Sequence, residues 1–268
     1  MHWMPQARLY PPYLRSRIKA GRGVGEGVAY RPWFRVRDVP SRGTSSSVLG
    51  IKVPRAYQSL SELQTTYFFL TERRASTVDV REHWPILDID GTLELCAQLG
   101  VPHGYRGTFP EPFTITFLVT ERVNDRLVTR AASVTTREDA ADPAIRRRLA
   151  VEHAWCARKG IAWTLVDTSA FDKTLLSSLR FVRSWFRNRY EPDDALATRF
   201  VDGFNTVYQT NMVLGELTRR VAKLTHTPAD IADDTFRYCA WSGRIDVSLL
   251  HPISLDAPLI LRRSQARA

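Results

Sequence analysis

The sequence has 268 residues, of which 44% are hydrophobic and 25% are charged, and 38 Lys and Arg against 28 Asp and Glu give a formal net charge of +10. This balance is typical of a folded globular protein and excludes a mostly disordered chain. No stretch approaches the roughly 20 consecutive apolar residues that span a bilayer. The arginine-rich excess of positive charge favours nucleic acid, an anionic membrane surface or an acidic protein as partner.

The cysteine pattern and the N-terminal residues indicate the cellular compartment. Cys96, Cys156 and Cys239 lie far apart and show neither CxxC nor Cys/His ligand spacing. This excludes a zinc motif and a disulfide framework and fits a reducing interior. Residues 1–12 lack the apolar core and the cleavage site of a secretory signal. We therefore expect a soluble, cytoplasmic protein that does not contact a membrane.

The first fifty residues are basic, rich in glycine and poor in apolar periodicity. Four glycines alternate with other residues at positions 21–27, directly after a group of cations. The spacing is not GxGxxG and no strand precedes it, so this is not a dinucleotide-binding loop. We expect residues 1–50 to form a basic arm, either disordered or lying along phosphates.

Residues 51–169 contain a mixture of helix and strand patterns. Leucines and Tyr67 at helical spacing predict a helix over 59–74, with Ser59 or Ser61 as its cap. Strands are predicted at 77–81, 113–120 and 127–136, the last two joined at the Asn124-Asp125 turn. A helix over 142–159 and a strand over 162–167 complete an α/β unit with helices beside a mixed sheet.

The chain becomes helical after a boundary near residues 168–171. Helices are predicted over 172–189, 195–204, 206–224 and 228–238, followed by a glycine turn and a strand over 244–249. Short helices followed by a turn and a strand favour a helix-turn-helix or winged-helix module. We therefore expect a mixed-sheet domain over 51–169 and a helical, winged-helix-like domain over 170–268.

Several motifs occur in an order that is typical of one family. They are Arg17-Ile-Lys-Ala-Gly-Arg-Gly-Val-Gly, Tyr30-Arg-Pro-Trp, Val39-Pro-Ser, Leu60-Ser-Glu-Leu, Val78-Asp-Val-Arg-Glu-His-Trp-Pro and Trp163. The chain thereby resembles the TnsA family, the endonuclease subunits of heteromeric transposases of the Tn-seven type. The resemblance implies an α/β fold of the restriction-endonuclease-like PD-(D/E)xK type, followed by a winged-helix-like domain. It also implies three partners: double-stranded DNA of transposon ends, a TnsB-like transposase and a TnsC-like AAA+ ATPase.

The resemblance also locates a metal site, at which this sequence departs from the family. The family holds magnesium with a glutamate on the first helix, an aspartate on one hairpin strand and a Glu/Gln-x-Lys motif on the return strand. The matching positions are Gln64, Thr116, Ser133 and Thr135. Without carboxylates, little is left to hold magnesium against bulk water. We therefore expect no catalytic residue, no metal and no cofactor.

The combined expectation is a non-catalytic subunit that binds transposon-end DNA and bridges the TnsB-like and TnsC-like partners. It could also associate with an active TnsA homologue that supplies the missing cut. Charge and setting suggest a group of DNA contacts, among which Trp33 could stack on a base. These candidates are Arg15, Arg17, Lys19, Arg22, Arg31, Trp33 and Arg35.

Two other functions remain open from the sequence. An active magnesium-dependent endonuclease could nick the 5′ transposon ends with relocated ligands, for which Asp88 and Asp90 are the candidates. A DNA-binding regulator unrelated to transposition could use the same fold only to bind duplex DNA. Glu152 matches an acidic position of the family and is interpreted as a relic or a structural ion pair.

Overall fold

The computed structural model describes residues 10–38 and 44–262 and divides the chain into two compact units. The first unit comprises Met1–Glu72 and Ser76–Ser169, and the second comprises Arg73–Ala75 and Ala170–Ala268. Within the described ranges, no helix combines the length and the apolar character needed to cross a membrane.

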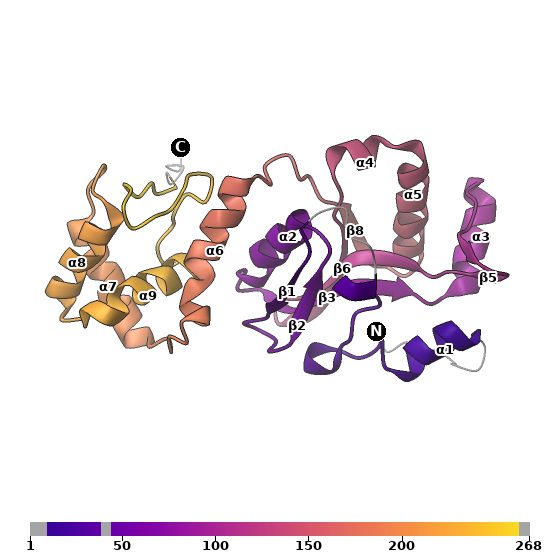
Figure 1. Ribbon diagram of the computed structural model, residues 1–268, viewed down its shortest axis with the longest axis horizontal. Helices are drawn as coiled ribbons and strands as arrows, with labels where there is room; N and C mark the ends of the chain where they lie inside the picture. The colour runs from indigo at the N-terminus through magenta and orange to yellow at the C-terminus, as the bar shows by residue number, and fades with distance from the viewer. Residues whose placement is uncertain (1–9, 39–43, 263–268) are drawn as a thin grey trace. The chain divides into compact units, whose positions relative to one another are not determined.

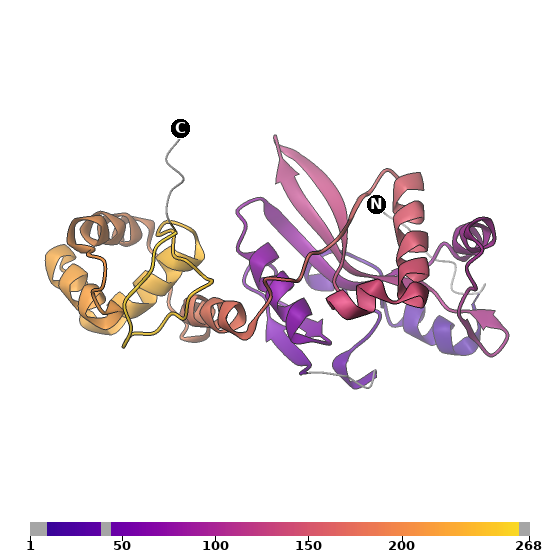
Figure 2. The same cartoon turned by 90° about the horizontal axis from the view of Figure 1, so that it is seen from above.

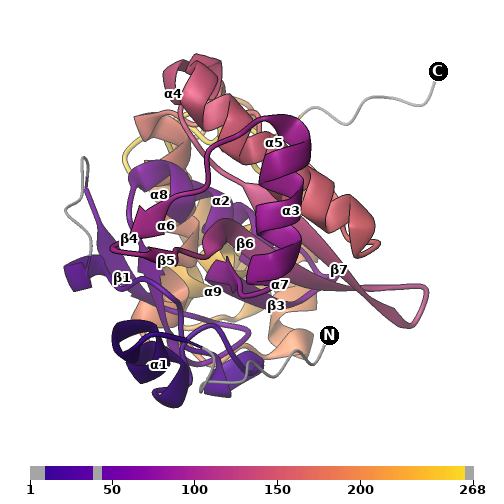
Figure 3. The same cartoon turned by 90° about the vertical axis from the view of Figure 1, so that its right-hand side faces the viewer.

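A four-stranded sheet forms the centre of the first unit. Its strands are β3 (Thr77–Ile86), β6 (Phe113–Val123), β7 (Arg126–Ser133) and β8 (Ala162–Leu165), in the order β3-β6-β7-β8. The first three pair antiparallel and β8 pairs parallel with β7, so the predicted mixed sheet is confirmed. Asn124 and Asp125 have φ of 47° and 59°, as a two-residue hairpin turn requires. The hairpin tip extends beyond the helices in Figure 3.

Helices and smaller hairpins surround this sheet (Figure 1). They are α2 (Glu62–Glu72), α3 (Ile89–Leu99), α4 (Arg137–Ala141), α5 (Pro143–Arg158), the β1 (Ser46–Leu49) and β2 (Ala56–Ser59) pair, and the β4 (Tyr105–Arg106) and β5 (Phe109–Pro110) pair. Phe117 on β6 contacts Tyr67 of α2, with ring centroids 5.1 Å apart. Its neighbour Leu118 joins the buried cluster that contains Trp155 of α5. Because adjacent strand residues point to opposite faces, α2 and α5 cover opposite faces of the sheet.

The described residues of the basic arm predicted over 1–50 are folded rather than disordered, and its contact with phosphates stays a prediction. Helix α1 (Pro12–Lys19) buries Leu14 and Ile18 in a small cluster with Tyr10, Trp33 and Leu87. The alternating glycines all have positive φ, and a Cβ on Gly23 would lie 2.2 Å from Cγ of Pro85. Gly23 therefore packs tightly against protein, whereas a Cβ built on Gly21 or Gly27 would have nothing within 4 Å. The Val39-Pro-Ser motif lies outside the described residues.

The second unit contains four helices in its described part (Figures 1 and 2). They are α6 (Lys173–Arg187), α7 (Asp194–Val207), α8 (Leu214–Thr225) and α9 (Ala229–Trp241). The predicted helix over 206–224 is wrong at its start, because α7 continues through Val207 and α8 begins at Leu214. In place of the strand predicted over 244–249 there is an isolated bridge between Val247 and Leu261. The winged-helix assignment stays a prediction.

A three-residue segment from the first half of the sequence belongs to the second unit. Arg73 donates from Nε to the Trp241 carbonyl at 3.2 Å and from Nη2 to the Ala240 carbonyl at 2.9 Å. The last carbonyls of a helix lack intrahelical partners, so the guanidinium caps the end of α9.

Candidate functional site

Gln64, the position that matches the family's helix glutamate, takes part in a variant of the capping box at the start of α2, in which its side chain accepts from the residue before the N-cap. Its backbone N–H donates to Oγ of Ser61 at 3.3 Å, and its side-chain Oε1 accepts from the N–H of Leu60 at 2.9 Å. This reciprocal arrangement satisfies donors that the helix itself cannot. Of the two caps predicted from the sequence, Ser61 is therefore correct, and Gln64 has a local structural role.

Thr116, Ser133 and Thr135 lie where β6 and β7 meet, close to the end of their pairing at Phe117 and Ala132. Oγ1 of Thr116 accepts from the N–H of Val134 at 3.1 Å, which brings these two strand positions together. The Thr135 carbonyl accepts from the Thr168 hydroxyl at 3.1 Å. Gln64 lies on α2. One turn further along this helix, Tyr67 packs against Phe117, which is the neighbour of Thr116 on β6.

Ser133 connects this strand end to a buried carboxylate. Its hydroxyl donates to Oε2 of Glu152 at 2.6 Å and accepts from Nε1 of Trp163 at 3.1 Å. Glu152 is fully buried on α5, and Nη1 of Arg148 lies 2.8 Å from its Oε1. Burial raises the pKa of Glu152, and Arg148, Ser133 and Trp163 offset only part of that rise.

Glu152 does form an ion pair, as one of its two interpretations expected, and whether it is also a relic of the family's site is untested. The set of partners around it was not predicted from the sequence. Arg148 precedes Glu152 by four residues, a spacing that places the two side chains on the same face of a helix and could have been recognised. Trp163 and Ser133 could not, because their contact depends on the parallel pairing of β7 with β8.

The donor set at these positions does not fit a magnesium ion. Magnesium prefers near-octahedral coordination by carboxylate and water oxygens. Around the strand end there are hydroxyls and one carboxylate, and an arginine already neutralises that carboxylate. Among the described residues, no three His, Cys, Asp or Glu side chains are grouped so that they could hold a metal.

Asp88 and Asp90, the candidates for relocated ligands, do not form a second carboxylate site. Asp88 is the N-cap of α3, where its Oδ1 accepts from the N–H of Gly91 at 3.3 Å. Its Oδ2 accepts from Nε1 of Trp155 at 3.0 Å and pairs with Nζ of Lys159 at 2.9 Å. Burial alone would raise the pKa of Asp88, but these contacts outweigh it and lower the pKa. Asp90 is exposed.

The candidate DNA contacts cluster in the N-terminal segment, and most of them also stabilise it. Arg15 donates to the Tyr10 carbonyl at 2.9 Å, and Arg31 donates to the Ala20 carbonyl at 3.0 Å. Arg22 pairs with Asp38 at 2.6 Å. Lys19 is exposed, and the guanidinium of Arg17 lies 5.3 Å from the ring centroid of Trp33.

Positive charges crowd one another in this segment. The pKa of Arg35 is lowered mainly by the neighbouring charge of Arg22, then by burial and by Arg37. Burial, followed by the charge of Arg22, lowers the pKa of Arg17. Like charges held this close would be relieved by a bound anion. Asp38, which pairs with Arg22, offsets part of this repulsion, and DNA binding by the segment stays a prediction.

The expectation that Trp33 contacts DNA is wrong, because its side chain is buried. Its side chain is only 1% exposed and is part of the cluster beneath α1. A base cannot stack on a ring that protein atoms already cover. Trp33 is therefore a core residue against which the basic segment packs.

The chain is similar to the transposition protein TnsA of transposon Tn7 from Escherichia coli. The two are 27% identical over 171 residues, which cover 64% of this chain and 62% of that protein. The similar region thus spans less than two thirds of the relative. No family model matches the chain. This distant similarity supports a TnsA-like transposase subunit, and the mixed sheet fits a nuclease fold of that kind.

Proposed function

We propose that this protein is a non-catalytic, TnsA-like subunit of a DNA transposition complex. It binds transposon-end DNA and bridges a TnsB-like transposase and a TnsC-like ATPase, without cutting the 5′ strand itself. The observation that carries this proposal is the ion pair between Glu152 and Arg148 beside Ser133. A cation from the protein itself neutralises the remaining carboxylate where a metal-dependent nuclease needs free acidic ligands.

Local structure at the other matching positions supports the same proposal. Gln64 is engaged in the capping box and Thr116 accepts from the backbone of Val134. These contacts satisfy the polar groups without any metal. The net charge of +10 and the crowded arginines of the N-terminal segment support the DNA-binding part of the proposal.

The test is an end-cleavage assay with the full chain, its TnsB-like and TnsC-like partners, and labelled transposon-end DNA in Mg²⁺ or Mn²⁺. We expect 3′ cuts made by the transposase and no 5′ nicks. A pull-down on the same DNA should recover both partners more efficiently when this chain is present.

The decisive control adds an active TnsA homologue, which should produce 5′ nicks in the same reaction. Metal-dependent 5′ nicks that need this chain alone would overturn the non-catalytic assignment. Partners that assemble equally well without the chain would overturn the bridging role.

A further inference from the structure

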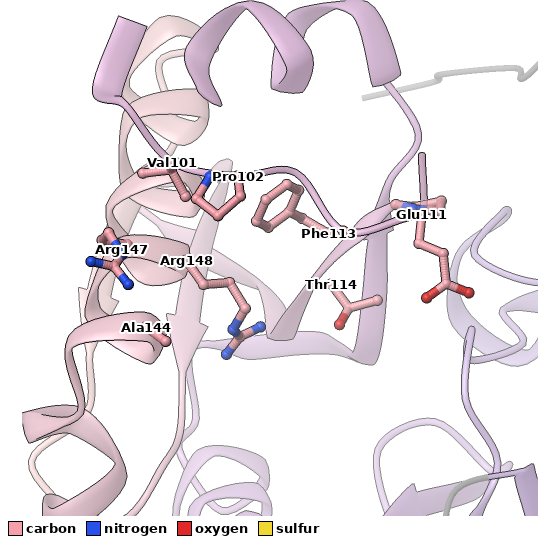
Figure 4. A pocket seen from close by; sticks show the side chains of 10 residues that line it. Val101, Pro102, Glu111, Phe113, Thr114, Ala144, Arg147 and Arg148 are labelled. Carbon is pink, nitrogen blue, oxygen red and sulfur yellow. The ribbon is translucent and has the colours of Figure 1, made fainter. Parts of the chain in front are cut away.

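A pocket of about 340 Å³ opens between the N-terminal half of α5 and the start of β6 (Figure 4). Val101, Pro102 and Phe113 form its apolar wall. Its polar lining includes Arg147 and Arg148 of α5 and Thr114 of β6. Thr114 is two residues before Thr116 on the same strand, so their side chains point to the same side. The pocket therefore adjoins the strand end at which the family places its metal.

Arg147 gives one end of this pocket a positive charge, and Arg148, whose charge is balanced by Glu152, adds hydrogen-bond donors. Glu152 is buried and lies 2.8 Å from one nitrogen of Arg148, and the Arg148 side chain also lines the pocket. Arg147 is exposed, and within the described part of the chain it has no ion pair. Glu111 also lines the pocket, but in Figure 4 it lies on the side away from Arg147. Its carboxylate is 3.9 Å from Nη1 of Arg106.

This combination fits an anion with an apolar neighbour. Guanidinium groups match the oxygens of a phosphate, and the Thr114 hydroxyl can donate to the same group. The apolar wall can accommodate the sugar attached to that phosphate. An arginine neutralises a phosphate but does not activate water, so such a site binds DNA without hydrolysing it.

We propose that Arg147 and Arg148 bind a backbone phosphate of duplex DNA at this pocket, where arginine supplies the positive charge that a metal supplies in a nuclease. The choice of duplex DNA as ligand rests on the proposed function. The pocket itself rests on the geometry of α5, β6 and the Glu152–Arg148 pair.

The experiment compares Arg147→Gln with Arg146→Gln in the full chain. Arg146 is the adjacent exposed arginine of α5 and does not line the pocket, so it controls for the loss of one charge. Binding of a fluorescent duplex is measured by anisotropy over a range of salt concentrations, in EDTA. We expect Arg147→Gln to weaken binding roughly fivefold and to reduce the slope of log K against log salt by about 0.9, the value for one phosphate contact. Arg146→Gln should change the affinity less than about twofold.

Arg148 is tested in the double variant Arg148→Gln/Glu152→Gln, which avoids leaving a buried carboxylate without its cation. We expect a loss similar to that of Arg147→Gln, with an unchanged far-UV circular dichroism spectrum. Equal losses from the Arg146 and Arg147 variants, or no loss from either, would overturn the inference. The inference would also be overturned if the wild-type chain bound poly-glutamate through Arg147 but did not bind duplex DNA. The end-cleavage and pull-down assays would still decide the proposed function in each case.

Discussion

At Glu152 a fully buried carboxylate is balanced by an arginine whose side chain is 43% exposed. We expect Glu152→Gln to leave stability at pH 7 unchanged or to raise it by up to about 1 kcal/mol, because the amide still accepts from Ser133 and no charge is buried. Arg148→Gln should cost about 2–3 kcal/mol, because it leaves the carboxylate buried without a cation. Urea unfolding at pH 7 measures both values.

The pH dependence of the Arg148 variant gives an internal check on this prediction. Because folding raises the pKa of Glu152 above its ordinary 4.5, the ionised form is the destabilising one. The cost of Arg148→Gln should therefore be present at neutral pH and decrease as the pH falls toward 4.5, where the carboxyl takes up a proton. Similar losses for the two single variants at pH 7 would contradict this account.

His83 introduces a second pH effect of opposite sign. Burial lowers its pKa from 6.5 to about 4, and the hydrogen bond between Nε2 and the Gln58 carbonyl at 3.1 Å only partly opposes this. The folded protein thus keeps His83 neutral while the unfolded chain binds a proton, and stability falls as the pH decreases from 6.5 toward 4. The loss between pH 7 and pH 5 should be about 2 kcal/mol.

His83→Asn should remove this part of the acid sensitivity. Asparagine tolerates the positive φ of 49° at this position better than most residues do. Urea unfolding of the variant and the wild-type chain at pH 7 and pH 5 measures the difference. A variant that loses as much stability as the wild type over this interval would show that His83 is not the group responsible.

The candidate site could be located from the sequence only in part. Gln64, Thr116 and Ser133 belong to elements with clear periodicity, so their positions could be matched to a family pattern. Ser133 and Trp163 are 30 residues apart, and their contact follows from a strand pairing that periodicity does not specify. The pocket beside Arg147 depends on the packing of α5 over β6, which is a property of the folded chain.

Among the elements, α3 and α5 are joined through the cap of α3. Asp88→Ala should destabilise the protein by about 1–2 kcal/mol, because it removes the N-cap and leaves the indole N–H of Trp155 without its acceptor. Asp90→Ala is the matched control and should change stability by less than about 0.5 kcal/mol, because Asp90 is exposed.

Thermal unfolding with and without Mn²⁺ distinguishes this structural role from a relocated metal site. A structural role for Asp88 predicts the same loss of stability in both conditions. Stabilisation of the wild-type chain by Mn²⁺ that disappears in Asp88→Ala would instead favour relocated ligands.

The elements predicted correctly are those in which apolar residues recur at a regular spacing along the chain. The hairpin β6–β7 and helices α2, α5 and α6 are of this kind. Helix α3 was missed because its start, Asp88 to Gly91, has the composition of a turn. Strand β3 was predicted too short because Pro85 ordinarily interrupts a strand, but β3 lies at the edge of the sheet, where proline is tolerated. Helix α1 was missed because its apolar partners Trp33 and Leu87 come from later in the chain.

For the whole molecule, the absence of 5′ cutting would change the products of transposition. With 3′ ends cut and joined while the 5′ ends stay attached, the donor remains linked to the target. We therefore expect mainly cointegrates rather than simple insertions in cells that carry this chain with its partners. Long-read sequencing of the junctions measures the ratio, and co-expression of an active TnsA homologue should shift it toward simple insertions. Simple insertions without such a homologue would contradict the proposed function.

Arg73 places a constraint on the time order of folding. Its hydrogen bond to the Trp241 carbonyl joins residues 168 positions apart. At a synthesis rate of about 5–20 residues per second, Arg73 leaves the ribosome roughly 8–34 s before Trp241 does. In that interval all strands of the β3-β6-β7-β8 sheet become available, so the sheet can form before the partner of Arg73 has been synthesised. The cap on α9 is therefore among the last contacts that a newly made chain can form.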